Sequence, residues 1–309
     1  MTHPLARGAP PLWASEWGED GFGPFVAFEV EGVVQRMRWI RKGTFWMGSP
    51  DEESGRRDDE ARHLVTLPRG FWLADTPVTQ ALWETVMGDN PSRFRLPLRP
   101  VEQVNCEEAQ AFCKALDTRV PGLNPRLPTE AEWERACRAG TETATWIGDL
   151  ELLGERNAPL LDSIAWYGGN SGVNFDLEEG HDSARWDETQ YAHKKAGTRK
   201  VALKDANPWG LYDMLGNVYE WCADVYERQL HTGRRRFSVY TDNIEGSLRV
   251  IRGGSWLSLA GSVRAAYRDA FETGFRRTNL GFRVAGGPAP IGGAQEAEPT
   301  KRSGDPTKG

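Results

Sequence analysis

The sequence predicts an α+β fold that has many loops and little regular secondary structure. Its 309 residues include 34 glycines, 19 prolines and 13 tryptophans, a combination that favours an aromatic core crossed by turns over a helical bundle. Strand-like alternation occurs only in short stretches, and three segments carry the apolar spacing and capping residues of helices. Because 39% of the residues are apolar, the chain can form a substantial core.

The first predicted element is a β-hairpin between residues 25 and 41. Apolar and polar residues alternate there, and Glu31-Gly32 offers a turn between the two strands. Residues 63–67 and 70–75 are predicted to be two further short strands. The charge-rich run at 51–62 is predicted to be a solvated loop.

Capping residues mark the beginnings of the three helices. Thr79 precedes a helix over residues 80–87, and Asn105 begins a second helix with Glu108 at its third position. Thr129 opens the third helix with a capping box, in which the first side chain and the glutamate three residues later satisfy each other's backbone amides.

Charge and cysteine content limit the class of protein. The formal net charge of −6 argues against nucleic-acid binding, which requires a basic face. No run of residues approaches the length of a membrane span and no signal peptide is evident, so we expect no membrane partner and a cytoplasmic location. The cysteines form no CxxC pair and are predicted to be free, buried thiols: Cys106, Cys113, Cys137 and Cys222.

Two conserved-looking motifs enclose an irregular segment near the C-terminal end. Residues 252–256 read Arg-Gly-Gly-Ser-Trp and residues 279–283 read Asn-Leu-Gly-Phe-Arg; together we call them the frame. The segment between them, residues 257–278, has neither helical nor strand periodicity. A rigid frame around an irregular segment is typical of a binding surface.

Five motifs in order carry a resemblance to a known family. They are residues 43–49, 75–79, 126–134 and 207–221, followed by the frame. The chain resembles the formylglycine-generating enzyme, or sulfatase-modifying factor, family over about 39–285. The resemblance implies a C-type-lectin-like fold.

The resemblance also suggests a division of the chain. Residues 1–38 would form an N-terminal extension that includes the hairpin and packs on the domain, and residues 39–285 would form the C-type-lectin-like domain. Within the domain we expect a polar insert at 174–197 and the variable segment at 257–278. Residues 286–309, rich in small and polar residues, are predicted to be a disordered tail.

The family contains copper-dependent formylglycine enzymes, iron-dependent sulfoxide synthases, non-catalytic paralogues and the variable proteins of diversity-generating retroelements. The copper enzymes use two cysteines, and Ser258 and Val263 stand at the matching positions. Neither can bind copper(I) or form a thiolate. For iron the only local candidates are His181-Asp182 and His193, which do not form a 2-His-1-carboxylate pattern.

The variable proteins fit the segment better. In them, adenine-directed change of an asparagine codon cannot yield Lys, Gln, Glu, Met or Trp, and none of the presumed variable positions holds one of these residues. The resemblance implies that an unknown protein or other macromolecular ligand binds through these positions: Leu257, Ser258, Leu259, Gly261, Ser262, Tyr267, Asp269, Ala270, Phe271, Thr273, Phe275, Arg277 and Thr278.

Phe271 and Phe275 have two interpretations: a phenylalanine usually belongs to the core, whereas the family frame places both among surface positions. We expect exposed anchors. The frame itself can be held through charge-assisted hydrogen bonds of arginines within and beside it: Arg264, Arg268, Arg276 and Arg283.

The resemblance allows calcium and implies no other required cofactor. Asn217 and Glu220, with the carbonyls of Leu215 and Val218, match the family's calcium-binding turn, and hard oxygens are the ligands calcium prefers. A hydrogen-bonded turn without metal is the alternative. A second site is matched only by Asn170-Ser171, because its expected carboxylate is missing from residues 201–204.

We therefore expect a bacterial, non-catalytic ligand-binding variable protein of a diversity-generating retroelement. One alternative is a metal-dependent oxidoreductase of the formylglycine-generating and sulfoxide synthase superfamily. Another is a regulatory domain that binds one fixed protein partner.

Overall fold

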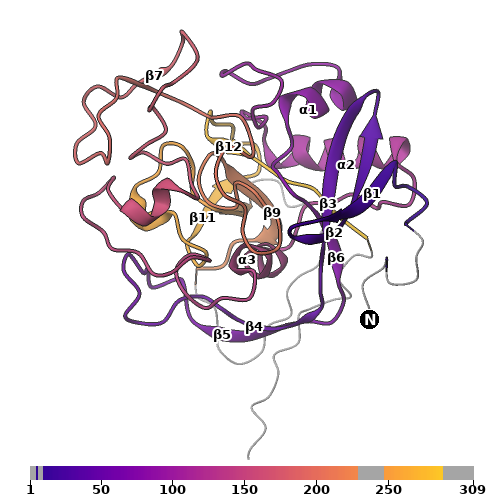
Figure 1. Cartoon of the computed structure of the whole chain (residues 1–309), viewed down its shortest axis with the longest axis horizontal. Coiled ribbons are helices and arrows are strands. Elements are labelled where there is room, and N and C mark those ends of the chain that lie inside the picture. Colours follow the sequence, from indigo (N-terminus) through magenta and orange to yellow (C-terminus); the bar gives the residue numbers. More distant parts are fainter. Residues whose placement is uncertain (1–4, 6–9, 229–246, 288–309) are drawn as a thin grey trace, which may run out of the picture.

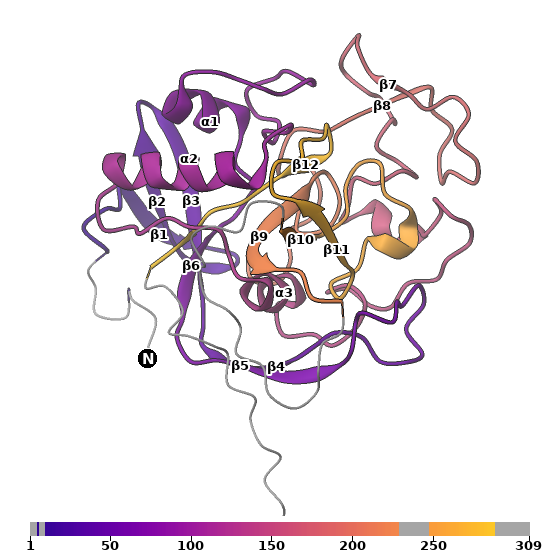
Figure 2. The same ribbon diagram turned by 180° about the vertical axis from the view of Figure 1, so that it is seen from behind.

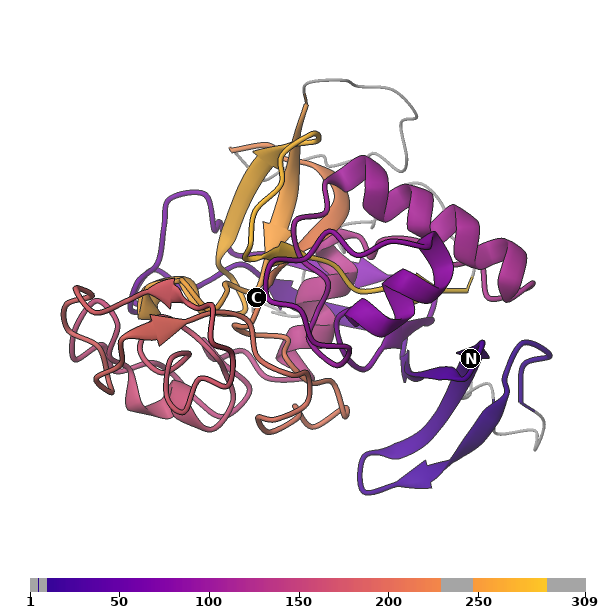
Figure 3. The same cartoon turned by 90° about the horizontal axis from the view of Figure 1, so that it is seen from above.

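A computed structural model of the chain describes residue 5 and residues 10–228 and 247–287. The N-terminal strands lie at one end of the molecule, and the loops between residues 140 and 200 lie at the other (Figures 1 and 3). The predicted tail at 286–309 falls outside the described residues from position 288 onward. Residues 1–4 and 6–9 of the expected N-terminal extension are also outside them.

The first sheet has five antiparallel strands in the order β1-β2-β3-β6-β13. The predicted hairpin is confirmed as β2 and β3, joined at Glu31 and Gly32, whose φ angles of 49° and 84° form the turn. Because β3 also pairs with β6, main-chain hydrogen bonds join this hairpin to the body of the domain. The strands span Glu16–Asp20, Gly23–Val30, Val33–Ile40, Phe71–Ala74 and Ala285–Gly286.

The three predicted helices are confirmed as α1 (Gln80–Met87), α2 (Cys106–Arg119) and α3 (Glu130–Arg138). The Thr79 side chain accepts a hydrogen bond from the first turn of α1, and capping boxes begin α2 and α3. In Figure 2, α2 lies in front of β2 and β3, and α3 lies below the second sheet.

The second sheet brings the two halves of the frame together. Its strand order is β11-β10-β9-β12, with β12 parallel to β9. The frame enters it at the end of β10 and again at β12, while β11 is an edge strand with one neighbour among the described residues. The strands span Arg268–Glu272, Leu248–Arg252, Tyr219–Val225 and Leu280–Gly281.

Two smaller ribbons complete the regular structure. The strands β4 (Gly43–Met47) and β5 (His63–Leu67) pair with each other and lie below α3 in Figure 2, which confirms the strand predicted at 63–67. The strands β7 (His181–Asp182) and β8 (Lys195–Ala196) pair within the polar insert. Short 3-10 helices lie at Pro159–Asp162 and Ala260–Ser262.

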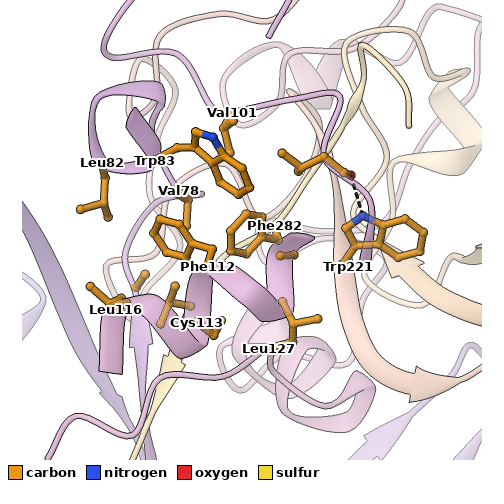
Figure 4. Packing of buried hydrophobic residues seen from close by; sticks show 14 of the residues in the cluster. Val78, Leu82, Trp83, Val101, Phe112, Cys113, Leu116, Leu127, Trp221 and Phe282 are labelled. Atoms are coloured by element: carbon orange, nitrogen blue, oxygen red, sulfur yellow. Dashed lines mark hydrogen bonds between the residues drawn. The ribbon is translucent and has the colours of Figure 1, made fainter. Parts of the chain in front are cut away.

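The main core is aromatic, as the composition predicts. Trp83 stacks on Phe112 with ring centroids 5.4 Å apart, and the Phe282 ring of the frame meets Phe112 edge-on at 5.3 Å (Figure 4). The indole of Trp221 donates to the Val104 carbonyl at 3.0 Å. Phe282 is therefore a buried part of the frame that fixes the end of the segment 257–278 in the core.

The insert at 174–197 packs on the other end of the frame. Trp186 stacks nearly parallel to Trp256, with centroids 6.1 Å apart, and the ring of His181 lies 5.5 Å from Trp256. Phe94, from the N-terminal half of the chain, meets the Trp256 ring edge-on. Trp256 is fully buried as a result.

The interpretation of residues 51–62 as a solvated loop is wrong for three of its six carboxylates, while Asp51, Glu52 and Asp58 are exposed as expected. Glu53, Asp59 and Glu60 are each at least nine-tenths buried. They face a buried arginine and a tyrosine from distant parts of the chain: Glu53 and Glu60 contact Arg264, and Asp59 accepts from the Tyr226 hydroxyl at 2.6 Å. A buried carboxylate requires such partners, and sequence distance hides them.

Candidate ligand-binding surface

Buried arginines hold the frame and the segment that follows it to α3. Arg252 pairs with Glu134 and donates to the carbonyls of Ala265 and Ala266 at 2.9 Å each. Arg268 makes two hydrogen bonds with Glu130, of 2.5 and 2.9 Å. Because every one of these charged side chains is at least 98% buried, each guanidinium and carboxylate depends on its partner.

Arg264 ties the same region to the loop at 51–62. Its guanidinium makes two hydrogen bonds with Glu60, of 2.8 and 2.7 Å, a third with Glu53 at 2.5 Å, and one with the Gly55 carbonyl at 2.6 Å. Paired charge of this geometry gives strong, directional hydrogen bonds. Arg264 thus joins the segment 257–278 to the loop at 51–62 inside the fold.

The burial of the residues around Arg264 divides the predicted segment 257–278 into three parts. Residues 257–262, which we call the pocket stretch, and residues 269–278, the edge stretch, both reach the surface. Residues 263–268 between them are all buried, and we call them the buried span.

Ten of the thirteen predicted ligand-binding residues have partly or fully exposed side chains or, for glycine, backbone. They are Leu257, Leu259, Gly261, Ser262, Asp269, Ala270, Phe271, Phe275, Arg277 and Thr278. The other three, Ser258, Tyr267 and Thr273, are more than nine-tenths buried, contrary to the expectation of displayed side chains. Ser258 turns inward to hydrogen-bond Ser255 and Tyr219, which explains its burial.

A pocket opens beside the pocket stretch. It has a volume of about 370 Å³, and Tyr267 lies in its wall, where the hydroxyl accepts from Arg57 at 3.0 Å. The segment contributes Leu259, Gly261, Ser262 and Tyr267, and other loops contribute Gly55, Arg57, Leu152, Gly154 and Glu155. No local sequence signal indicates the second group, because these residues come from loops 100 or more positions away.

The edge stretch carries a compact aromatic group. The rings of Phe271 and Phe275 lie 4.8 Å apart, and the Arg277 guanidinium lies 5.2 and 4.9 Å from their centroids. Both rings are partly exposed and Arg277 is exposed. Phe271 also packs against the main core, so the group is supported from below.

The main chain of the edge stretch is fixed by the beginning of α2. The Thr273 carbonyl accepts from the Cys106 amide, and the Arg277 carbonyl accepts from the Gln103 amide, both at 2.9 Å. Arg276 adds two hydrogen bonds with Glu108, of 3.0 and 2.7 Å. Since the first two bonds use only backbone atoms, they do not depend on which side chains the stretch carries.

A family comparison identifies this architecture. Residues 25–287 match the sulfatase-modifying factor enzyme 1-like domain. The chain belongs to this family. A solved structure, Treponema denticola variable protein 1, is 30% identical, with a TM-score of 0.65 over 85% of this chain and 98% of that one. The C-type-lectin-like α+β fold and the likeness to a retroelement variable protein, both implied by the resemblance, are confirmed.

Curated relatives of the family have diverse names. The chaperone protein LppX of Paenibacillus barcinonensis is 28% identical over 69% of this chain and 79% of its own. The formylglycine-generating enzyme of Thermomonospora curvata is 30% identical over 72% of this chain and 67% of its own. The serine/threonine-protein kinase pkn1 of Chlamydia caviae is 33% identical over 82% of this chain, which spans only 38% of the kinase.

The family's calcium-binding turn is occupied by protein groups here. Both oxygens of Glu220 accept from Arg283, at 2.6 and 2.7 Å, and one also accepts from the Trp133 indole at 2.7 Å. The Asn217 side-chain oxygen accepts from the Arg199 amide at 2.9 Å. A guanidinium thus already neutralises the carboxylate, and a backbone amide occupies the Asn217 oxygen, so these two side chains do not fit a calcium ion in this arrangement.

The residues of the second family site also have structural partners. The Asn170 side chain accepts from the Tyr167 amide at 2.9 Å and donates to Asp162 and to the Ala165 carbonyl. The Ser171 hydroxyl donates to the carbonyl of Trp256 at 2.8 Å. Asn170 and Ser171 therefore fix the chain that precedes the insert and help to position the frame.

None of the four thiols in the sequence stands at the positions that match the family's copper ligands, Ser258 and Val263. All four cysteines are buried and free, as predicted. Burial raises the pKa of Cys106 to about 11 and the pKa of Cys113 and of Cys137 to about 12, and it also raises the pKa of Cys222. Such thiols stay protonated near neutral pH and are poor nucleophiles and ligands.

The histidines of the insert serve its packing. His193 lies against Trp186 and hydrogen-bonds the Ser183 hydroxyl at 2.7 Å, while His181 packs on Trp256. Within residues 10–228 and 247–287, no group of three or more histidine, cysteine, aspartate or glutamate residues could hold a metal ion. In the same part of the chain, no helix has both the length and the apolar character needed to cross a bilayer.

Proposed function

We propose that this chain is a non-catalytic ligand-binding protein of the diversity-generating retroelement type. It binds a protein or other macromolecule through the side chains of the pocket stretch and the edge stretch. The buried span between them acts as a fixed support, and of its residues 263–268 only Tyr267 lines the pocket.

The observation that carries this proposal is the way in which the edge stretch is held. Its backbone is anchored by amides of residues 103 and 106, while Phe271, Phe275 and Arg277 project from it at least partly into solvent. A loop held by main-chain atoms can exchange side chains without losing its shape. That property is what a diversified surface requires.

The aromatic group is suited to be the centre of an interface. Two phenyl rings and a guanidinium within about 5 Å of each other present apolar area and a positive charge together. Binding energy in protein interfaces concentrates on such aromatic and arginine side chains. The partly exposed Leu257 and Thr278 extend the surface toward Trp256, whose indole donates to the Thr278 carbonyl.

This chain has no cysteine at the two positions that carry the family's formylglycine chemistry. Ser258 is engaged with Ser255 and Tyr219, and Val263 is a buried aliphatic residue. Neither can become a copper(I) ligand. We propose that the protein requires no redox metal.

Comparison of the coding DNA tests the diversification directly. We expect a near-copy of the DNA for residues 257–278 close to the gene, differing from it at adenines of the copy only. The differences should fall on codons of the pocket and edge stretches and spare those of the buried span. A segment without such a copy, or with differences spread over all four bases, contradicts diversification and favours a fixed partner.

A second experiment tests the absence of catalysis. Purified protein is incubated with copper(I), oxygen and a cysteine-containing peptide, and the peptide mass is followed. We expect no conversion of the cysteine, with a formylglycine-generating enzyme as the positive control. Conversion at a rate that depends on bound copper contradicts the proposal.

A further inference from the structure

A second cleft, separate from the predicted segment, lies between the N-terminal hairpin and α3. Its volume is about 410 Å³, within the range of small-molecule sites. The two ends of the hairpin, the β3–β4 connection, α3 and a tryptophan loop form its walls: Phe22, Pro24, Arg38, Trp39, Arg41, Lys42, Arg135 and Trp209. None of these residues lines the pocket beside Tyr267.

The cleft is cationic in a chain whose formal net charge is −6. Four of its eight lining residues are arginine or lysine, and none is acidic. Arg38 pairs with Asp20 outside the lining, at 2.9 Å. Within the described part of the chain, Arg41, Lys42 and Arg135 form no ion pair with a carboxylate.

Arg135 is fixed in place by neutral groups. Its guanidinium donates to the carbonyls of Arg41 at 3.0 Å, Lys42 at 3.4 Å and Thr44 at 3.5 Å. Burial lowers the pKa of Arg135, because the guanidinium is partly removed from water without a counter-charge. A side chain on Gly43 would come within 2.5 Å of this guanidinium, so the glycine leaves it room.

The walls beside these charges are flat rings. The Arg135 guanidinium lies 5.6 Å from the Trp209 ring, and Trp39 and Phe22 also border the cleft. Indole faces accept another flat ring by stacking, whereas the charged groups accept an anion. A ligand that satisfies both walls must carry an anionic group joined to a ring.

We propose that this cleft binds a small phosphate monoester of a flat ring, with the phosphate at Arg41, Lys42 and Arg135 and the ring between Trp39 and Trp209. Inorganic phosphate would pair only with the cationic side chains, and an uncharged ring would stack only on the indoles. The proposal does not depend on the segment 257–278 or on its diversification.

Isothermal titration calorimetry with four probes tests both halves of the site. Phenyl phosphate and adenosine monophosphate carry phosphate and ring, inorganic phosphate carries the charge, and phenol carries the ring. We expect at least one aromatic phosphate to bind about 10-fold or more tightly than phosphate or phenol, and raised salt to weaken it. The tighter of the two aromatic probes identifies the ring as phenyl or nucleobase.

Exposed residues allow the charges to be removed without disturbing the fold. Arg41→Gln and Lys42→Gln should each weaken the aromatic phosphate about 3- to 10-fold, whereas Lys114→Gln, an exposed lysine of α2 outside the cleft, should not. Trp209→Leu should weaken phenyl phosphate but not inorganic phosphate. The proposal is overturned if inorganic phosphate binds as tightly as both aromatic phosphates, if no probe binds at millimolar concentration, or if the Arg41→Gln/Lys42→Gln double variant binds as the wild type does.

Discussion

The buried span and the edge stretch are neighbours in the sequence but differ in their surroundings. Arg264 and Arg268 of the buried span are almost completely enclosed, and each lies against one or two carboxylates. Arg277 of the edge stretch is exposed and lies over the rings of Phe271 and Phe275. Arginine therefore forms buried ion pairs that hold the fold in one region and is a candidate ligand-binding residue in the other.

The partner of each arginine, more than its residue type, decides its role. A buried guanidinium without a counter-charge would be too costly, so Arg264 and Arg268 are tied to residues that cannot change independently. An exposed guanidinium keeps its hydration, and its replacement costs little. On the proposed function, side chains of the edge stretch can be exchanged because the adjacent buried span holds the backbone in place.

The largest expected effect is the loss of a buried pair. Arg264→Met leaves Glu53 and Glu60 without their cation, and we expect the free energy of unfolding to fall by about 3–5 kcal/mol. Arg277→Met, the matched variant in the edge stretch, should change it by less than about 0.5 kcal/mol. Urea unfolding of both variants gives the ranking, and equal losses would remove the distinction between the two regions.

The next comparison concerns aromatic residues at the frame and in the edge stretch. Trp256→Ala should cost about 3 kcal/mol or more, because the indole is fully buried among Phe94 and Trp186. Phe275→Ser should cost about 1 kcal/mol or less, because its ring is partly exposed. Thermal melts measure the difference. If Phe275→Ser unfolds as readily as Trp256→Ala, the ring is a core residue and the surface loses an anchor.

A pH effect is expected from the buried region. Burial, followed by the neighbouring Glu130 carboxylate, raises the pKa of Asp224 to about 7. The folded state therefore retains a proton that the unfolded chain loses near pH 4, so this group's contribution to stability is present below pH 4 and is lost as the pH rises to 7. Asp224→Asn should remove about 3 kcal/mol of that decline between pH 4.5 and pH 7.

Urea unfolding at pH 4.5 and at pH 7 measures this contribution. The difference in unfolding free energy between the two pH values should be smaller in the variant than in the wild type. Parallel pH profiles of the two proteins would contradict the assignment of a raised pKa to Asp224.

The smallest expected effect concerns calcium. Because Arg283 already pairs with both oxygens of Glu220, we expect neither calcium nor a chelator to move the melting temperature by more than experimental error. Glu220→Gln is the positive control: it leaves Arg283 buried with a neutral partner, so it should lower the melting temperature with or without calcium. A reproducible stabilisation by calcium in the wild type would show that the turn rearranges to bind the ion.

Local sequence signals determined where the hairpin turns and where the three helices begin. The hairpin turn at Glu31-Gly32 and the caps Thr79, Asn105 and Thr129 act over three or four residues, so they could be identified without the fold. The frame could be recognised in the same way, because its glycine, tryptophan and arginine positions are contiguous. These signals indicated the fold class, the three helices and the irregular segment 257–278, but not the division of that segment into buried and exposed parts.

Only the tertiary structure decided which charges and rings are enclosed. Glu60 and Arg264 are 204 positions apart, and nothing local to either indicates the other, so the run at 51–62 resembled a solvated loop. The inward direction of Ser258 depends on Ser255 and Tyr219, and the burial of Trp256 depends on Trp186 of the insert. Burial is a property of partners brought together from a distance, and no single segment contains that information.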